Sequence, residues 1–306
     1  MSRILITGAG GNVGRALLGA LDGHDVLATD VQPVAHTRFE TLDVTGDDAD
    51  RVIGRFRPDV VIHLASIVTP PAGSTRAFAW RVDVQGSRNV LAACLTHGVR
   101  RLVVTSSGAA YGYHADNPVP LVETDAIRGN AEFPYADHKR QVEDMLAEAR
   151  RDHPALEQVV LRVGTVLGEG VENQITALFR KKRLLAVAGS RSPFVFIWSK
   201  DLVRIVIRAS TDGPPGIYNV AGDGAMTVQD LARAMGKPVL SLPAWMLRAA
   251  LSVARPLRLS RYGPEQVSFL QYRPVLDNAA LKQKFGYQPE KTSEQVFDLW
   301  RDWARP

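Results

Sequence analysis

A tyrosine and a lysine four positions apart are the residues best suited to chemistry in this sequence. Tyr135 and Lys139 open a stretch with a helical pattern, so their side chains are expected one turn apart on one face. A phenol with a pKa of about 10 is a poor base at neutral pH, but a neighbouring ammonium stabilises the phenolate and lowers that pKa. When it is protonated, the same phenol can donate to a developing alkoxide. The spacing therefore predicts proton transfer to and from a substrate hydroxyl.

A strand that ends in hydroxyl side chains precedes this pair. Residues 102–104 are apolar and are followed by Thr105, Ser106 and Ser107, which could hold the substrate oxygen. A Tyr-x-x-x-Lys spacing alone is common by chance. Downstream of such a strand and of a glycine-rich loop, the spacing becomes specific for this chemistry.

The glycine-rich loop lies near the N-terminus and predicts a dinucleotide site. Gly8, Gly11 and Gly14 have the spacing G-x-x-G-x-x-G, directly after an expected strand and before an expected helix. Glycine allows the sharp turn and the close approach of the backbone to a pyrophosphate. The helix that follows offers unpaired N–H groups to the anion. The position between strand and helix makes an otherwise weak pattern strong.

Two carboxylates follow the next two expected strands. Asp30 ends the second strand, where a carboxylate can accept both ribose hydroxyls of NAD and repels a 2′-phosphate. No arginine follows closely, so NAD is favoured over NADP. Asp43 could meet the adenine edge or could equally cap the helix that follows, and both interpretations are open.

Runs of β-branched residues alternate with helical patterns over the first two-thirds of the chain. Strands are expected at residues 3–7, 25–29, 38–41, 59–64, 101–106 and 157–162, and helices at 12–22, 47–56, 76–97 and 135–152. Continuous apolar strands that alternate with helices predict an α/β fold: a doubly wound parallel sheet of the Rossmann type, covered on both faces.

The pattern changes after about residue 165, where segments become shorter, more basic and richer in proline. We expect an NAD-binding Rossmann domain over residues 1–165, completed by strands near 193–198 and 217–221. Residues 166–306 should form mostly a smaller, interleaved C-terminal domain. This domain would cap the substrate over the carboxyl ends of the strands, where doubly wound folds bind ligands.

Composition narrows the class of protein. The 306 residues are 45% hydrophobic and 23% charged, as in an ordinary globular protein. The lone cysteine, Cys94, lies in an apolar helical stretch, which excludes an intrachain disulfide and a cysteine-rich metal site, so no metal is expected. Neither a signal-peptide pattern nor an apolar run of about 18 residues occurs, so we expect a cytoplasmic protein without a membrane partner.

The charge and the amphipathic pattern of the sequence do not identify a particular binding partner. The net charge is +5, and the densest basic run covers residues 180–183. This run lacks the aromatic interleaving and zinc spacing of nucleic-acid binders, so no nucleic-acid partner is expected. Residues 245–251 are amphipathic and are expected to form a capping helix rather than a membrane anchor.

Taken together, the motifs resemble the extended short-chain dehydrogenase/reductases, and most of all the NAD-dependent epimerase/dehydratase group that includes UDP-glucose 4-epimerase. The resemblance rests on the glycine loop and the Tyr-x-x-x-Lys pair, and it extends over nearly the whole chain. Its further motifs are residues 63–65, 106–112, 217–223 and 285–289.

The resemblance implies roles for individual residues. Ser107 would orient the substrate oxygen, Tyr135 would be the acid/base and Lys139 its partner. The implied cofactor-binding residues are Gly8, Gly11, Asn12, Val13, Gly14, Asp30, Asp43, Val44, Leu64, Ala65, Tyr135, Lys139 and Val163. Tentative substrate contacts are Ser107, Thr165, Asn173, Phe194 and Trp198. A homodimer built from the helices at 76–97 and 135–152 is implied as well.

Three positions depart from the family pattern. Asp83 stands where the family usually has an asparagine linked to a water relay that reaches the lysine. Thr165 replaces an asparagine, and Phe194 replaces an arginine that binds a diphosphate. An apolar ring cannot neutralise a diphosphate. The basic run at 180–183 or the arginines within 248–261 could substitute, and we expect at best weak, salt-sensitive binding of UDP-glucose.

The sequence therefore predicts an enzyme that transfers hydride between NAD and a secondary alcohol carbon of a small-molecule substrate. The family likeness favours an epimerase, in which NAD is reduced and reoxidised within one turnover. One alternative is a dehydrogenase or ketoreductase that acts on a less polar, non-nucleotide substrate. A second is an NAD-sensing binding protein. A dehydrogenase or ketoreductase consumes added NAD, whereas an epimerase has no net consumption. Measurable turnover distinguishes both enzymes from a binding protein.

Overall fold

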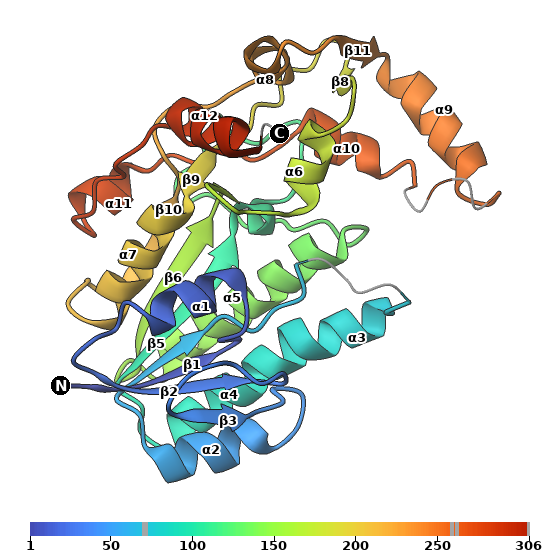
Figure 1. The fold of residues 1–306 in the computed structure, drawn as a ribbon. Coiled ribbons are helices and arrows are strands. Elements are labelled where there is room, and N and C mark those ends of the chain that lie inside the picture. Colours follow the sequence, from blue (N-terminus) through green and yellow to red (C-terminus); the bar gives the residue numbers. More distant parts are fainter. Residues whose placement is uncertain (69–72, 258–259, 261–262, 305–306) are drawn as a thin grey trace.

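A seven-stranded parallel sheet forms the centre of the protein, as seen in the computed structural model of residues 1–68, 73–257, 260 and 263–304 (Figure 1). The strand order is β10-β6-β5-β4-β1-β2-β3, and each neighbouring pair is parallel. The strands are β1 (Arg3–Thr7), β2 (Asp25–Asp30), β3 (Phe39–Thr41), β4 (Val60–His63), β5 (Arg101–Ser107), β6 (Glu157–Val163) and β10 (Gly216–Val220). The order reverses at β1, between β2 and β4, which confirms the predicted doubly wound sheet.

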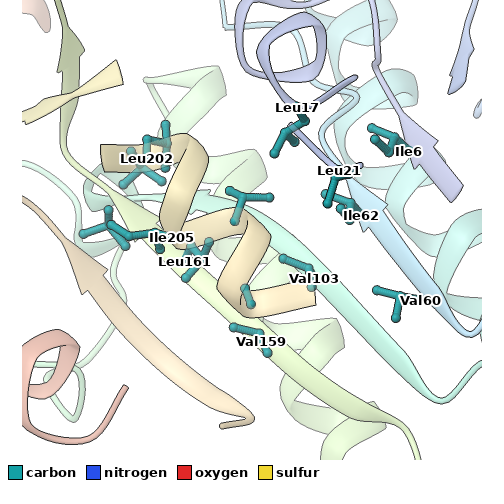
Figure 2. Close-up of a cluster of buried hydrophobic side chains, with 14 of the residues drawn as sticks. Ile6, Leu17, Leu21, Val60, Ile62, Val103, Val159, Leu161, Leu202 and Ile205 are labelled. Carbon is teal, nitrogen blue, oxygen red and sulfur yellow. The ribbon is translucent and has the colours of Figure 1, made fainter. Parts of the chain in front are cut away.

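Helices cover both faces of this sheet because side chains along each strand alternate between the faces. On one face, Ile4 and Ile6 of β1 pack with residues of α1 (Asn12–Leu18) and α7 (Ser199–Ser210). Figure 2 shows Leu17 and Ile205 within this cluster. On the other face, Leu5 lies in a cluster with residues of α2 (Asp48–Phe56), α4 (Gly86–Thr96) and α5 (Pro134–Asp152). The two clusters hold the carboxyl ends of the strands in fixed relative positions.

The predicted helix at 76–97 consists of three segments. A short helix α3 (Arg76–Trp80) runs into a π-helical turn, Arg81–Gln85, and then into α4. Such single π-turns are often found at functional sites. The buried side chain of Asp83 lies within this turn.

Most of the remaining elements lie beyond the carboxyl ends of the main strands, whereas α11 (Ala279–Gln283) packs against β10 at the side of the main sheet (Figure 1). Two small parallel sheets pair β7 with β9 and β8 with β11. The elements are β7 (Thr165–Leu167), α6 (Gln174–Phe179), β8 (Leu184–Val187), β9 (Phe196–Trp198), α8 (Val228–Met235), β11 (Val239–Leu242), α9 (Ala244–Ala254), α10 (Gln266–Gln271), α11 (Ala279–Gln283) and α12 (Ser293–Ala304). No helix in the described ranges has the length and apolar character that a membrane crossing requires.

One predicted strand of the main sheet lies elsewhere. The segment near 217–221 does join the main sheet, as β10 beside β6. The prediction that 193–198 also completes this sheet is wrong, because β9 pairs with β7 in a separate sheet. The edge of β6 that faces away from β5 is taken by β10 and leaves no place for a further strand there.

Candidate active site

The glycine loop joins β1 to α1 and is shaped by backbone contacts. Gly8 has φ +71°, and a Cβ on it would lie 2.7 Å from the backbone nitrogen of Ala65. A Cβ on Gly14 would lie 2.6 Å from Cα of Ala9. A Cβ on Gly11 would meet only the carbonyl oxygen of Gly8, at 3.3 Å. Thus Gly8 lets the ends of β1 and β4 meet, and Gly14 lets α1 pack against the loop.

The carboxylate of Asp30 is fixed beside this loop. Its Oδ2 accepts from the N–H of Gly10 at 2.9 Å, and its Oδ1 accepts from the N–H of Gln32 at 3.1 Å. The loop leaves its backbone open for a pyrophosphate, and a fixed carboxylate lies next to it. This combination fits a dinucleotide whose adenosine ribose has no 2′-phosphate, as in NAD. These residues would hold the cofactor: the loop backbone at the pyrophosphate and Asp30 at the ribose.

Several of the predicted cofactor residues surround the loop. Asn12 is exposed and Val13 is partly buried at the start of α1. Leu64 and Ala65 follow β4, and the N–H of Leu64 donates to the carbonyl of Thr7. These residues lie at the carboxyl edge of the sheet, as the sequence predicts for ligands of a doubly wound fold.

Asp43, Val44 and Val163 are placed differently. The Oδ1 of Asp43 accepts from the N–H and the hydroxyl of Thr45, both at 2.8 Å, and the N-cap of α2 is Asp47. Asp43 is therefore not the helix cap, and its carboxylate is exposed. The side chains of Val44 and Val163 are buried in the two core clusters, so chiefly their backbone could serve a cofactor.

The catalytic residues predicted from the sequence converge at the end of β5. The Nζ of Lys139 lies 5.6 Å from the centre of the Tyr135 ring and donates to the carbonyl of Thr105 at 2.9 Å. Ser107 ends the same strand, and its Oγ accepts from the N–H of Ala109 at 3.1 Å. The strand thus positions the lysine through its backbone and the serine through its last residue.

A buried carboxylate, that of Asp83, lies close enough to Lys139 to be stabilised by its charge. Asp83 accepts at Oδ1 from the hydroxyl of Ser66 (2.9 Å) and from the N–H of Ile67 (2.7 Å), and its Oδ2 lies 2.8 Å from Nδ1 of His138. Burial alone would raise the pKa of Asp83, but the bond with His138, the charge of Lys139 and the bonds from Ile67 and Ser66 hold it below its usual value. Asp83 therefore reaches the Tyr-x-x-x-Lys motif through His138. The Nε2 of His138 is buried and has no hydrogen-bond partner among the described residues.

His63 has a structural place. Its Nδ1 lies 2.7 Å from Oγ1 of Thr7 and its Nε2 lies 2.9 Å from Oγ of Ser87. Burial and the nearby charge of Lys139 lower the pKa of His63 to about 3, so the ring is neutral at physiological pH. These local bonds give the ring a structural role that joins β1, β4 and α4.

A second buried network, which sequence reasoning missed, ties α5 to the sheet. The guanidinium of Arg162 donates to the carboxylate of Glu143 at 2.7 Å and to the hydroxyl of Tyr111 at 2.8 Å. Glu143 also accepts from Ser106 at 2.5 Å. Glu143 follows Lys139 by four residues on α5, and this spacing is the signal that could have identified it.

Four of the residues predicted to contact the substrate lie in the part of the chain that follows β6, and three of these, Phe194, Asn173 and Trp198, have structural partners there. The ring of Phe194 is buried and stacks on Phe196 with centroids 5.8 Å apart. The side chain of Asn173 caps α6 in a capping box with Thr176. Thr165 is partly buried at the start of β7. These contacts account for Phe194 and Asn173 without a substrate, and the substrate roles remain predictions.

Trp198 is the fourth of these residues and lies at the end of β9. Its Nε1 donates to Glu169 at 3.1 Å, and Lys200 and Lys291 place their Nζ atoms 4.9 and 4.8 Å from the indole centre. The indole therefore belongs to a buried apolar cluster and also has cations over its ring.

Arg273 is the residue of greatest consequence that the sequence analysis did not single out. Its guanidinium carbon lies 3.9 Å from the centre of the Phe194 ring and 5.0 Å from that of Phe269. Its Nη1 donates to the carbonyl of Ser192 at 2.8 Å, while its Nε has no partner among the described residues. Burial lowers the pKa of Arg273 to about 9, which leaves the group cationic at neutral pH.

This cation is connected to the catalytic tyrosine through aromatic rings. Phe269 packs edge-on against Tyr113 at 5.2 Å, and both belong to a cluster with Tyr135. Arg273 is one of many arginines in a basic segment, so its position over Phe194 could not be inferred from spacing. Arg273 thus places a positive charge next to Phe194, the residue that replaces the arginine usual in the family.

Known proteins are similar to this chain in sequence and in fold. A UDP-glucose 4-epimerase of Azospirillum brasilense is 33% identical over 178 residues, which cover 54% of this chain and 49% of that protein. The structure of UDP-glucose 4-epimerase from Thermotoga maritima with UDP-glucose has a TM-score of 0.75 and 21% identity, and the match covers 98% of both chains. MoeE5 in complex with UDP-glucuronic acid and NAD has a TM-score of 0.75 and 23% identity over 99% of both chains. The two structural matches establish the fold.

The family follows from the sequence itself. The profile described as "NAD dependent epimerase/dehydratase family" matches residues 4–221, well over half of the chain. This match includes the glycine loop, Asp30, Ser107 and the Tyr135–Lys139 pair. It confirms the resemblance drawn from the motifs, the enzyme class and NAD as the cofactor. The chain therefore belongs to the NAD dependent epimerase/dehydratase family.

Proposed function

We propose that this enzyme epimerises a secondary alcohol carbon of a nucleotide sugar or a closely similar anionic sugar. In this proposal residues 1–165 bind NAD and residues 166–306 form most of the substrate cap. The observation that carries the proposal is the convergence of Tyr135, Lys139 and Ser107 at the end of β5, beside the glycine loop of an NAD-dependent family.

The residues divide the proton chemistry among them. Tyr135 takes the hydroxyl proton of the substrate as the alcohol is oxidised to a ketone, and it returns a proton when the ketone is reduced. The ammonium of Lys139 stabilises the phenolate, and the carbonyl of Thr105 holds that ammonium in place. Ser107 donates to the reacting oxygen. The glycine loop and Asp30 would hold NAD, which would supply reversible hydride exchange with the carbinol carbon and so allow its inversion.

Arg273 supports an anionic substrate. A guanidinium that lies against two aromatic rings, with one buried N–H unpaired among the described residues, is suited to donate to a phosphate oxygen. The absence of the family's arginine at position 194 therefore does not exclude diphosphate recognition, because Arg273 brings its charge to the ring of Phe194. The exposed run at 180–183 is a second candidate for the same role.

The test is turnover of a panel of nucleotide sugars by the wild-type enzyme and by Tyr135→Phe. The phenylalanine keeps the ring but removes the transferable proton, so turnover should fall by about 10²-fold or more while NAD affinity is retained. Interconversion of epimers without net formation of NADH supports the proposal. A Tyr135→Phe variant that retains nearly full activity would remove Tyr135 from the mechanism.

One observation favours a second candidate function, a net dehydrogenase or ketoreductase. The cluster around Tyr135 is lined by aromatic rings, those of Tyr113, Phe133 and Phe269, which would suit a less polar substrate. Stoichiometric production of NADH from hydrophobic secondary alcohols would select this candidate over the epimerase. Family membership as an NAD-dependent enzyme leaves the NAD-sensing binding protein without support.

Quaternary state and location belong to the proposal as well. We propose a homodimer through α4 and α5 with the preceding α3, and a cytoplasmic, reducing location, which suits a chain whose single cysteine is buried. The molar mass in solution, measured by light scattering on the purified protein, tests the dimer.

A further inference from the structure

Helix α9 presents an apolar face that no other described element covers. Leu247 and Leu251 pack toward Val187 and Val267 in a small core shared with α10. At about 100° per residue, Trp245, Met246, Ala249, Ala250 and Val253 lie on the opposite side of the helix. Of these large side chains Trp245 is 69% exposed and Val253 61% exposed, and Leu257, one turn further on, is 62% exposed.

The small sheet next to α9 extends this surface. Leu185 of β8 and Leu240 of β11 are direct cross-strand neighbours, and both are exposed. They point to the same face as Val187 and Leu242, which α9 and α10 cover. The apolar surface of α9, Leu185, Leu240 and Leu257 is here called the α9 patch. In Figure 1, α9 projects from the capping region at the end of this sheet.

The segments that build the α9 patch carry positive charge only. Residues 173–200 and 231–264 contain twelve lysines and arginines and no aspartate or glutamate, whereas the whole chain has a net charge of +5. On α9 itself, Arg248 is exposed on the flank of the apolar face, and Arg255 follows two turns later on the same flank. The remainder of the chain is therefore acidic. Four of these cations, Arg180, Lys200, Arg233 and Arg255, pair with carboxylates that lie just outside the two segments, and the others leave the segments with a net positive charge.

We propose that the α9 patch docks on the surface of an anionic lipid bilayer. An apolar helix face with a tryptophan at its start and arginines on its flank lies in the interface between head groups and acyl chains, and anionic lipids add electrostatic attraction. A second copy of this chain fits less well, because two identical patches would bring two sets of basic residues together, and the nearby acidic residue, Glu265, already pairs with Arg255 of its own copy. This mode of binding needs no membrane-spanning helix. It departs from the expectation from the sequence that residues 245–251 form only a capping helix and that the protein has no membrane partner.

Docking would orient the substrate cap toward the membrane. Helix α10 packs beside α9 and carries Phe269, whose ring contacts Tyr113 in the cluster of Tyr135. The elements that cover the catalytic tyrosine thus lie directly behind the docking helix. The proposal concerns the surface alone and does not depend on the chemistry assigned to the site.

The test is co-sedimentation of the purified full-length protein with vesicles. We expect binding to vesicles of phosphatidylcholine and phosphatidylglycerol in equal amounts, little binding to pure phosphatidylcholine, and weaker binding as the salt concentration rises. The double variant Trp245→Asp/Val253→Asp should bind at least about tenfold more weakly. Trp303→Asp, which changes an exposed tryptophan on α12, is the matched control and should bind like wild type.

Tryptophan fluorescence gives a second readout. Transfer of Trp245 from water to the interface should shift its emission to the blue, and Trp245→Phe should keep vesicle binding while losing most of that shift. Equal circular dichroism and melting temperature of all variants show that the fold is intact. Absence of binding to anionic vesicles at low salt, or binding that the double variant leaves unchanged, overturns the proposal. So does self-association that the double variant abolishes in the absence of lipid.

Discussion

The choice of cofactor depends on one carboxylate. Asp30 is held beside the glycine loop by the N–H groups of Gly10 and Gln32, so its charge cannot move away from an incoming ribose phosphate. We expect NAD to bind at least about tenfold more tightly than NADP, a difference of about 1.4 kcal/mol. Asp30→Ala should narrow that gap by removing the repulsion. Titration of both cofactors by fluorescence or calorimetry measures it, and equal affinities in the wild-type enzyme would contradict the assignment.

A second carboxylate, Asp83, should affect stability in a pH-dependent way. Its pKa in the folded protein is below the ordinary value of 3.8, because its bonds and the charge of Lys139 outweigh burial. Its contribution to stability is therefore fully present above pH 3.8 and is lost as the pH falls through the folded-state pKa. Asp83→Asn should destabilise the protein by about 2 kcal/mol at neutral pH, through loss of a charged hydrogen bond.

Denaturant unfolding of wild type and Asp83→Asn from neutral pH downward checks this. The difference between the two proteins should shrink in the acid, as the wild-type carboxylate becomes protonated. Asp22→Asn, at an exposed position, is the control and should leave the unfolding free energy unchanged at each pH. A constant difference between wild type and Asp83→Asn over the whole range would show that Asp83 is not ionised in the folded state.

The sequence was sufficient for residues whose role depends on local spacing. Tyr135 and Lys139 are one helical turn apart, and Asp30 directly ends a strand, so their placement follows from secondary structure. Arg273 and His138 illustrate the opposite case. Arg273 contacts the ring of Phe194, 79 positions earlier in the chain, and His138 contacts the carboxylate of Asp83, 55 positions earlier. Contacts of that kind are decided by packing, which spacing does not encode.

At the scale of elements, the junction of β1 and α1 determines how closely a cofactor can approach the sheet. A Cβ on Gly14 would lie 2.6 Å from Cα of Ala9 and from the carbonyl oxygen of Gly8, which are backbone atoms that cannot yield. Gly14→Ala should therefore push α1 away from the loop, lower the melting temperature and weaken NAD binding by at least about tenfold. Gly19→Ala, at the other end of the same helix, meets nothing within 4 Å and is the control.

Calorimetry with NAD and thermal unfolding of both variants decide this prediction. Equal NAD affinity for Gly14→Ala and wild type would mean that the loop tolerates a displaced α1. Gly19→Ala should bind NAD as tightly as wild type does. Only then can a loss of NAD affinity in Gly14→Ala be attributed to the contact of its Cβ with the loop rather than to a general effect of alanine in α1.

Elements whose sequence pattern is continuous were predicted well, and elements whose partner is decided by topology were not. The strands at 3–7 and 25–29 begin and end within a residue of β1 and β2, because an uninterrupted apolar run can only be a buried strand there. The apolar run 194–197 has the same local character as those strands. It pairs with β7 in a separate sheet, and a choice of partner between distant segments has no local signal in the sequence.

At the scale of the whole molecule, negative charge lies mainly in the main sheet with its helices, and positive charge lies mainly in the cap. The acidic residues belong mainly to the segments that build the main sheet and its helices, and the acid-free stretches 173–200 and 231–264 belong to the cap. An anionic substrate that enters between them would meet its positive charge from the cap. The question is which of the many basic residues it meets.

Arg273 and the run at 180–183 make different predictions for a nucleotide sugar. Binding through the exposed run should be weak and should fall steeply with salt, as the sequence alone suggests. Binding through Arg273, which is enclosed by Phe194, Phe269 and Ser192, should be screened much less. We expect Arg273→Met to weaken UDP binding by at least about tenfold, since a charged hydrogen bond contributes about 1.5–3 kcal/mol.

Calorimetry of the NAD-loaded enzyme with UDP and UDP-glucose at low and moderate ionic strength distinguishes the two. The double variant Lys181→Gln/Lys182→Gln removes two exposed charges of the run and should leave UDP affinity nearly unchanged, as should Arg191→Met, an exposed arginine of the same segment. The reverse pattern, with affinity lost in the lysine variant and kept in Arg273→Met, would place the anion at the surface of the cap. The aromatic cluster around Tyr135 would then be free for a less polar group, and the dehydrogenase would become the better description of the enzyme.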